Sequence, residues 1–536
     1  MQQDDEQVAA AAPLDRGKRI VIFADGTGNA FSTQESNIWR LYQALDKQQK
    51  PTGLIQIARY MPGVGTASNK VIRYLDGITG FGVPSNVRKL YRFLCWNWDP
   101  GDEIYLFGFS RGAFTVRTLA GMVSWQGLMP RKDGSRTVGK AEMKRNVTAA
   151  WRAYRWATAP LVDERQSALN PRNWRMNPLI EGARFLRDGI VRLKRRIMGQ
   201  DQHSAVLAKR HRDALNGKVE IRFMGVFDTV EAYGMPIREF NRVFDWLVWP
   251  IQFRNRRCSP VVQMVRHALS LDDERLTFHP LRFDQGPRPD GLPGPETQEL
   301  WFAGMHSDVG GGYPDNAVSL DPLIWMRDEA AQQRLMFDPV IMARHERGRY
   351  PQALIHNSRA GLANFYRYAP RRIRGGAENG GVPVVHPSAV IKMRLGADGY
   401  APLGLPGDFQ VFTGGPDPAS EPHGLTRNLG AVEQVRRLIR WRKRTNYMTI
   451  LCIVGLLAIP FWQMWTGPVS PVGPAVLAGV NGAVGWMLPG VVMAGLLALL
   501  NNWVIAGPLI LAVWLIYMVN EALGDAIRDR GRQLWA

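Results

Sequence analysis

The C-terminal part of the chain contains a long uncharged stretch, and this stretch limits the possible folds most strongly. Between Arg444 and Glu521 there is no Asp, Glu, Lys or Arg, so more than 70 consecutive residues carry no formal charge. A helix needs only about 20 apolar residues to cross the hydrocarbon core of a bilayer. A buried helical hairpin in a soluble domain is the alternative, but a stretch of this length favours the membrane. We therefore predict a transmembrane region at 447–520.

Two segments of this region are long enough to span a bilayer. Tyr447–Trp465 predicts one span, and Val491–Met518 predicts a second, steeply tilted one. Gly473–Leu488 is interrupted by Gly and Pro, so it is a third span, a re-entrant segment or a loop. Basic flanks on both sides favour an even number of spans with both ends cytoplasmic. These flanks contain Arg436, Arg437, Arg440, Arg442, Lys443 and Arg444 on one side and Arg528, Arg530 and Arg532 on the other.

The residues before the membrane region alternate short apolar runs with helical patterns. Such alternation indicates an α/β fold with a mostly parallel sheet covered by helices on both faces. Residues 130–218 interrupt the alternation with helical patches rich in Arg, Lys and Trp, which predicts a helical insertion. The predicted strands are Arg19–Ala24, Leu54–Tyr60, Asp102–Phe107, Val219–Phe227 and Glu299–Ala303.

One serine lies in a pattern that is typical of nucleophiles. Residues 108–112 read Gly-Phe-Ser-Arg-Gly between a predicted strand and a predicted helix. In this context the pattern predicts a tight strand-to-helix turn that exposes the Ser110 hydroxyl at the carboxyl edge of the sheet. Glycines two residues away on either side are needed because side chains there would prevent the turn from closing. Ser110 is therefore the candidate nucleophile.

A serine nucleophile needs a base, and the base needs an acid to orient it. In this architecture the acid and then the histidine follow the serine along the chain. Asp228 ends one predicted strand and His306 follows another, so both are expected at the sheet edge that carries Ser110. The alternatives are a turn aspartate that bonds its own backbone and a structural surface histidine.

The other histidines fit this role less well. His267 and His279 are expected in or beside a helical segment, and His386, after an apolar run, is a weaker candidate base. Asp308 lies too close to His306 in sequence to be the expected orienting acid. We predict that it organises the turn before Gly310-Gly311-Gly312.

The negative charge that develops on the acyl oxygen needs backbone N–H donors. One expected donor is Arg111, the residue after the nucleophile. The second is expected from the loop D-G-T-G-N at 25–29, through Gly26 and Thr27, with Asp25 as a supporting residue. A dinucleotide-binding loop is the alternative for this segment, but it lacks the third glycine of that motif.

Five motifs occur in order along the chain: F-A-D-G-T-G-N, Y-M-P-G-V-G-T, G-F-S-R-G-A-F, G-V-F-D-T-V and W-F-A-G-M-H-S-D-V-G-G-G-Y. Over roughly residues 18–410 the chain resembles a bacterial α/β-hydrolase family that includes the phospholipase effectors of type VI secretion systems. The resemblance implies an α/β-hydrolase fold with Ser110 as nucleophile, Asp228 as acid and His306 as base. It also makes a secretion-machinery adaptor and an immunity protein candidate partners. The family commonly has D-G-T-W-N where this chain has D-G-T-G-N, and the hydrophobic C-terminal block lies outside the shared core.

Composition narrows the partners further. The net charge of +20 favours polyanions, namely nucleic acid or anionic lipid headgroups. The basic residues are scattered without a nucleic-acid-binding motif, so we expect a phospholipid substrate and a bilayer and no nucleic acid. Three widely spaced cysteines support neither disulfides nor a zinc site, and we predict no metal and no cofactor.

The leading hypothesis is a phospholipase A-like serine hydrolase with a Ser-Asp-His triad. The alternative is a membrane-anchored binding or pore-forming protein that uses a hydrolase-like fold without lipid turnover. Two locations are compatible with the sequence: a bacterial inner membrane with the catalytic domain cytoplasmic, or delivery to a target cell membrane. The predicted parts are a flexible tail without a signal peptide (1–17), the catalytic domain (18–430, with a candidate lid at 130–218), a basic juxtamembrane segment (431–446), the transmembrane region (447–520) and a basic tail (521–536).

Overall fold

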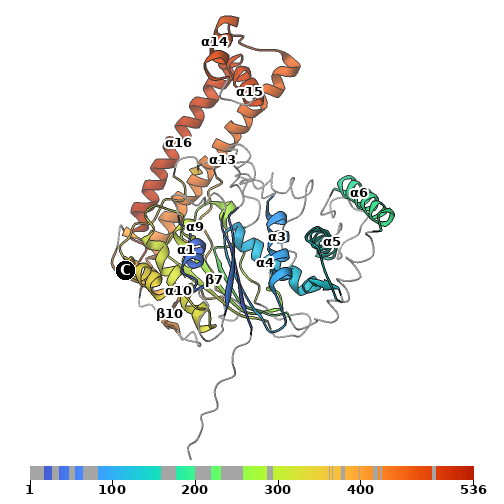
Figure 1. The fold of residues 1–536 in the computed structure, drawn as a ribbon. Coiled ribbons are helices and arrows are strands. Elements are labelled where there is room, and N and C mark those ends of the chain that lie inside the picture. Colours follow the sequence, from blue (N-terminus) through green and yellow to red (C-terminus); the bar gives the residue numbers. More distant parts are fainter. Residues whose placement is uncertain are drawn as a thin grey trace, which may run out of the picture.

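A mostly parallel sheet forms the centre of the computed structural model (Figure 1). Within the described residues it has nine strands in the order β11-β10-β9-β8-β7-β6-β3-β1-β2, and only β10 and β11 pair antiparallel. The strands are β1 (Arg19–Ala24), β2 (Gln56–Met61), β3 (Glu103–Phe109), β6 (Ile221–Phe227), β7 (Val262–Ser270), β8 (Glu296–Phe302), β9 (Val384–Val385), β10 (Gln410–Phe412) and β11 (Ser420–Pro422). The described residues are 17–26, 35–47, 55–63, 82–133, 135–158, 177–199, 219–230, 257–285, 294–360, 363–364, 366–375, 381–396, 399–414, 420–422, 425–485 and 490–535.

Helices cover both faces of this sheet because successive side chains of a strand point to opposite faces. In β1, Ile20 and Ile22 pack with α3 and α4, whereas Val21 and Phe23 pack on the other face with α1 and α10. All four side chains are fully buried. The continuous apolar runs that predicted the central strands thus result from burial on both faces. The helices around the sheet are α1 (Asn37–Ala44), α3 (Val83–Asn97), α4 (Arg111–Gln126), α10 (Leu320–Gln332), α11 (Pro339–Arg347) and α12 (Pro387–Arg394).

The predicted α/β architecture is confirmed, but the sequence reading missed one central strand. Arg19–Ala24 is a strand with the predicted bounds. The expectation that His267 lies in or beside a helix is wrong, because this residue lies in the middle of β7 and is fully buried. Its Nδ1 is 3.0 Å from Glu299 Oε1, and its Nε2 accepts the N–H of Thr229 at 3.2 Å. Partners on β8 and just after β6 allow a polar residue inside this strand, and no local pattern reveals them.

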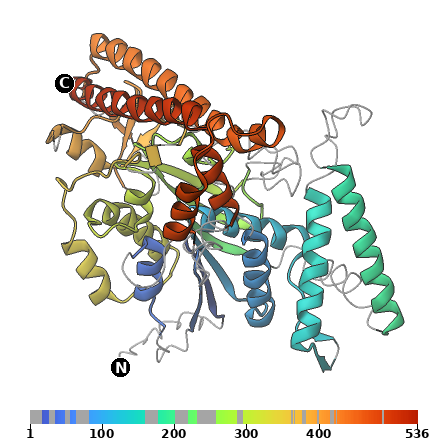
Figure 2. The same ribbon diagram turned by 90° about the horizontal axis from the view of Figure 1, so that it is seen from above.

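The insertion at 130–218 is mainly helical where it is described. It contains α5 (Lys140–Thr158) and α6 (Pro178–Ile197), preceded by the short strands β4 (Lys132–Asp133) and β5 (Arg136–Thr137). Figures 1 and 2 show α5 and α6 side by side at one edge of the domain. The helical character agrees with the sequence, and a role as a lid stays a prediction.

Two C-terminal helices are long and apolar enough to cross a membrane by length and composition: α13 (Leu429–Thr466) and α16 (Trp503–Gly531). They pack against each other and project from the α/β domain as a hairpin (Figure 1). Between them lie α14 (Pro474–Val484) and α15 (Gly490–Leu500), each of 11 residues. Such short helices do not reach across a bilayer, which needs about 20 residues. Two candidate spans therefore remain of the two or three predicted.

The predicted second span, Val491–Met518, is wrong in its bounds because the chain turns between α15 and α16. The side-chain oxygens of Asn501 and Asn502 accept the backbone N–H groups of Val472 and Val469 at 3.1 and 3.0 Å. These asparagines fix a turn inside a stretch that is otherwise apolar enough to continue as one helix. A criterion based on the absence of charge does not detect such a turn.

Polar contacts join the base of the helix hairpin to the α/β domain. Arg442 Nη1 donates to Glu274 at 3.3 Å, and Asn446 Oδ1 accepts the backbone N–H of Tyr368 at 3.1 Å. The guanidinium of Arg442 also lies over the ring of Tyr368, 4.6 Å from its centroid. The segment 366–371 therefore touches the membrane-length helices at one end. Its other end enters the candidate active site.

Candidate active site

Ser110 lies on the sharp turn between β3 and α4. Its backbone angles, φ 57° and ψ −121°, are ones that residues other than glycine rarely adopt. A Cβ atom at Gly108 would lie 2.6 Å from the Cα of Ala113. A Cβ atom at Gly112 would lie 2.0 Å from the carbonyl oxygen of Ala24 at the end of β1. Because these obstacles are backbone atoms, the turn requires both glycines, as the sequence pattern predicts.

His306 connects Ser110 to Asp228. Its Nε2 lies 2.8 Å from Ser110 Oγ, and its Nδ1 lies 2.5 Å from Asp228 Oδ2. All three side chains are buried, that of Asp228 completely. They follow the carboxyl ends of the parallel strands β3, β6 and β8, and His306 begins the short helix α9 (His306–Gly310). One edge of the sheet thus brings together three residues that are far apart in sequence.

Arg371 holds the far side of the Asp228 carboxylate, and the sequence reading missed this residue. Its Nη1 and Nη2 donate to the two carboxylate oxygens of Asp228, each at 2.7 Å. The same guanidinium donates to the backbone carbonyls of Ser270 and Phe278 at 2.7 and 2.5 Å. Arg371 lies among several arginines in a turn-rich stretch, so no local signal distinguishes it. Only the fold shows its partner.

Burial and charge together set the protonation of the pair. Burial alone would raise the pKa of Asp228, but the Arg371 guanidinium and the His306 ring outweigh burial and hold this pKa well below its ordinary value. Burial lowers the pKa of His306, although the neighbouring carboxylate opposes the change. At neutral pH this favours a neutral imidazole beside an ionised carboxylate. We assign the Nδ1 proton to the Asp228 bond, which leaves Nε2 to accept the Ser110 hydroxyl.

Acidic side chains hold the backbone that leads into His306. The N–H groups of three consecutive residues each donate to a different carboxylate, which fixes the direction of the His306 side chain. The pairs are Gly304 with Asp272 at 2.7 Å, Met305 with Asp308 at 3.0 Å and His306 with Asp273 at 3.4 Å. Asp308 thus holds the backbone just before His306, at the start of the turn that leads to Gly310. It also lies 2.6 Å from Nδ1 of His356.

The loop after β1 lies beside the nucleophile. A Cβ atom at Gly26 would lie 3.3 Å from the Cβ of Ser110. The carboxylate of Asp25 accepts hydrogen bonds from Ser36 Oγ at 2.5 Å, from Tyr60 Oη at 2.6 Å and from the N–H of Gly26 at 2.6 Å. Asp25 therefore organises this loop through partners on α1's N-cap and on β2.

The three predicted oxyanion donors differ in whether the structure describes them and in what their N–H groups contact. Arg111 is the first residue of α4, so its N–H belongs to the N-terminal turn of a helix that starts at the nucleophile. The N–H of Gly26 is engaged by Asp25 in this structure. Thr27 lies outside the described residues. The assignment of these donors to an oxyanion stays a prediction.

His386, the weaker candidate base, has a structural place in the fold. It is the N-cap of α12, where its Nδ1 accepts the N–H of Ser388 at 3.2 Å. Its ring stacks on Phe302 with 4.6 Å between the ring centroids. Burial lowers the pKa of His386 to about 3, and the charge of Arg349 adds to this. These contacts explain the residue without a catalytic role.

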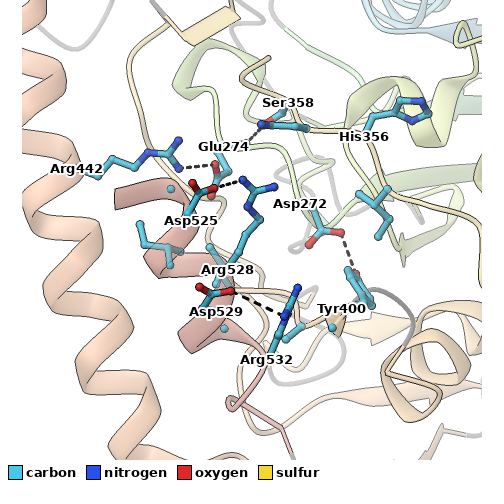
Figure 3. Close-up of a pocket in the computed structure, with 18 of the residues that line it drawn as sticks. Asp272, Glu274, His356, Ser358, Tyr400, Arg442, Asp525, Arg528, Asp529 and Arg532 are labelled. Atoms are coloured by element: carbon cyan, nitrogen blue, oxygen red, sulfur yellow. Dashed lines mark hydrogen bonds and ion pairs between the residues drawn. The ribbon is translucent and has the colours of Figure 1, made fainter. Parts of the chain in front are cut away.

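A cavity of about 540 Å³ lies at the junction between the α/β domain and the C-terminal end of α16 (Figure 3). Asp272 and Glu274 line it from the domain, and Asp525 and Arg528 line it from α16. Burial raises the pKa of Asp272 to about 7. Ser110 is not among the described lining residues, so this cavity belongs to the helix junction and not to the nucleophile.

The fold and the site geometry define the class of the chain, an α/β-hydrolase-like protein with a membrane-length helical hairpin. The family model of the type VI secretion system (T6SS) phospholipase effector Tle1-like catalytic domain matches residues 18–329. The chain therefore belongs to this family.

Two individual proteins are also similar to the chain. An uncharacterized protein of Saccharomyces cerevisiae, YEL023C, is 28% identical over 300 residues, which are 53% of this chain and 35% of the yeast protein. The chain thus spans about a third of the length of this relative. The crystal structure of an uncharacterized protein from Pseudomonas aeruginosa shares 15% identity with a TM-score of 0.34, covering 93% of this chain and 66% of that one.

The lowered pKa of His386 predicts a specific loss of stability in acid. The unfolded state, with a histidine pKa of about 6.5, binds the proton more tightly than the folded state. Stability therefore falls as the pH decreases from about 6.5 towards 3. In His386→Asn the new side chain still caps the helix but does not titrate, so we expect about 1.5 kcal/mol less loss of unfolding free energy between pH 6.5 and 5. Denaturant unfolding in detergent at both pH values measures this difference, and equal losses in the two proteins would contradict the assignment.

Proposed function

We propose that this protein is a serine hydrolase that cleaves acyl ester bonds of membrane phospholipids in the manner of a phospholipase A. The observation that carries the proposal is the unbroken hydrogen-bonded chain from Asp228 through His306 to Ser110 on a strained turn. Membership of a phospholipase effector family and the two membrane-length helices support a lipid as the substrate. In this proposal Ser110 is the nucleophile, His306 the base and Asp228 the orienting acid.

The first half of the reaction transfers the acyl group to the enzyme. His306 Nε2 takes the proton of Ser110 as Oγ attacks the carbonyl carbon of the ester. The resulting oxyanion receives hydrogen bonds from the N–H of Arg111 and from the loop after β1. When the intermediate collapses, the imidazolium gives its proton to the glycerol oxygen, and a lysophospholipid leaves.

The second half releases the fatty acid. A water molecule gives its proton to His306 Nε2 and attacks the acyl-enzyme, and the returned proton restores the Ser110 hydroxyl. The ionised Asp228 stabilises the imidazolium in both halves. Its low pKa, which Arg371 maintains against burial, ensures that this negative charge is present when it is needed.

The family also supports a role in T6SS delivery to a target cell. A secretion adaptor and an immunity protein are candidate partners in this proposal. With both ends of the hairpin on one side, the α/β domain lies on the side of the basic flanks.

Ser110→Ala tests the nucleophile directly. Because the hydroxyl supplies the attacking atom, hydrolysis should fall more than about 10³-fold, with no change in membrane insertion. The assay incubates the detergent-solubilised full chain with phosphatidylglycerol and phosphatidylethanolamine and quantifies fatty acid and lysophospholipid by mass spectrometry. Ser124→Ala, the same change further along α4, is the matched control and should retain activity.

The same experiment separates this proposal from a binding or pore-forming protein. Diacylglycerol or phosphatidic acid as the product would exclude the phospholipase A type. Full hydrolysis by Ser110→Ala would exclude the nucleophile. Equal leakage of vesicles with both proteins, without any lipid product, would favour the non-enzymatic alternative.

Arg371 is proposed as a positioning residue that acts through Asp228. Replacing it by Ala leaves a buried carboxylate without its cation, so kcat should fall about 10- to 100-fold with little change in KM. Loss of this positive charge also favours the imidazolium of His306, so the acidic limb of the pH profile of kcat/KM should move to higher pH. Arg371→Lys keeps the positive charge. In this variant the acidic limb of the pH profile of kcat/KM should stay in place, and part of kcat should be retained.

The control for this prediction is Arg372→Ala, which removes an exposed arginine next in sequence. If Arg371 only supported the fold, Arg371→Ala would lower the fraction of correctly folded, active protein and leave the acidic limb of the pH profile of kcat/KM unchanged. That outcome would contradict positioning through Asp228.

A further inference from the structure

Helix α6 presents its apolar side to solvent and its acidic side to the protein. Leu179, Leu186, Ile190, Leu193 and Ile197 are 81, 67, 67, 59 and 77% exposed. At 3.6 residues per turn these five side chains fall within about 60° of the helix circumference. A helix of a soluble domain normally turns such a stripe toward the core. Within the described residues this stripe has no cover.

The opposite side of α6 fixes this orientation through ion pairs with α5. Glu181 and Asp188, half a turn away from the apolar stripe, are buried. Arg155 Nη2 lies 3.6 Å from Glu181, and Arg152 Nη2 lies 3.5 Å from Asp188. Rotating α6 to bury its apolar residues would break both pairs and expose these partners. The outward direction of the stripe is therefore a built feature of the insertion.

Cations border the apolar stripe on both sides. Exposed Lys194 lies along one border together with exposed Arg187, which also donates to Asp188 at 2.8 Å, and exposed Arg196 lies along the other. In all, α6 carries six basic and two acidic residues. Long basic side chains at the edge of an apolar face reach lipid phosphates while their stems lie in the apolar layer. This positive charge complements the negative charge of an anionic membrane surface.

We propose that α6 lies in the surface of an anionic bilayer, with its apolar stripe below the headgroups, as a second membrane contact of the α/β domain. Figure 1 shows α6 near the rim from which α13 and α16 project, and Figure 2 shows it at a different edge of the domain. The helix hairpin and α6 therefore hold the domain at two separate places. Two such contacts limit its tilt on the bilayer. The proposal concerns membrane contact and does not depend on the catalytic roles proposed above.

Fluorescence depth measurements test this contact in the full chain. The three native cysteines are replaced, Ser110→Ala prevents lipid turnover, and an environment-sensitive fluorophore is attached at Ile190→Cys or, as the control, at Arg192→Cys on the opposite side of α6. The proteins are reconstituted into vesicles of phosphatidylcholine with or without phosphatidylglycerol. With phosphatidylglycerol, the label at 190 should shift to the blue and be quenched by spin labels on the acyl chains, and the label at 192 should not. High salt should weaken the effect.

Equal spectra at the two positions in anionic vesicles would overturn the proposal. A blue shift at 190 that depends on protein concentration and not on phosphatidylglycerol would also overturn it, in favour of a second copy of the chain. Loss of catalysis in any variant leaves this readout unaffected, so the two proposals fail separately.

A kinetic comparison gives a second readout, which rests on the proposed hydrolase activity. The double variant Leu186→Glu and Ile190→Glu should lower the hydrolysis of phosphatidylglycerol vesicles at least about tenfold, because it removes apolar area from the interface. Hydrolysis of a monomeric short-chain ester should stay unchanged. An equal loss on both substrates would show that α6 supports the fold and not the membrane contact.

Discussion

The site depends on a single buried charge, the carboxylate of Asp228. Its side chain has no solvent contact, and burial alone would drive it to the neutral form, in which it no longer stabilises an imidazolium. The bidentate hydrogen bond from Arg371 keeps the carboxylate ionised. The guanidinium also donates to two backbone carbonyls, which offset part of the cost of its own burial. Removing one partner leaves the other as an uncompensated charge in the core, which is why the two act as a unit.

Arg371 also links the site to the membrane-length helices. It ends the segment 366–371, whose other end contacts α13 through Tyr368 and Asn446. Glu274 connects the same helix to the run of acidic residues that holds the backbone before His306. The segments 366–371 and 272–274 therefore contact both the base of the hairpin and the candidate active site. The structure thus has two levels: an α/β core that positions the strand ends, and loops that fix side chains between those ends and the membrane-length helices.

The sequence was sufficient for the parts of the site that lie at strand ends. Ser110, Asp228 and His306 follow apolar runs, and a parallel sheet brings such ends to one edge whatever the connecting chain does. It was insufficient where partners are distant: β7 is hidden by the polar His267 at its centre, and Arg371 has no local pattern. The turn at residues 501–502 escaped a criterion based on charge alone for the same reason. Tertiary contacts decide each of these three features.

Covalent labelling of the nucleophile tests most directly whether His306 activates Ser110. The full chain in detergent is treated with a fluorophosphonate, which reacts with serines that a neighbouring base activates, and the labelled peptide is identified by mass spectrometry. If His306 activates Ser110, a single adduct forms rapidly on Ser110 in the wild-type protein and is nearly absent in His306→Ala. An adduct on another serine, or labelling of Ser110 at the same rate without the imidazole, would contradict this activation.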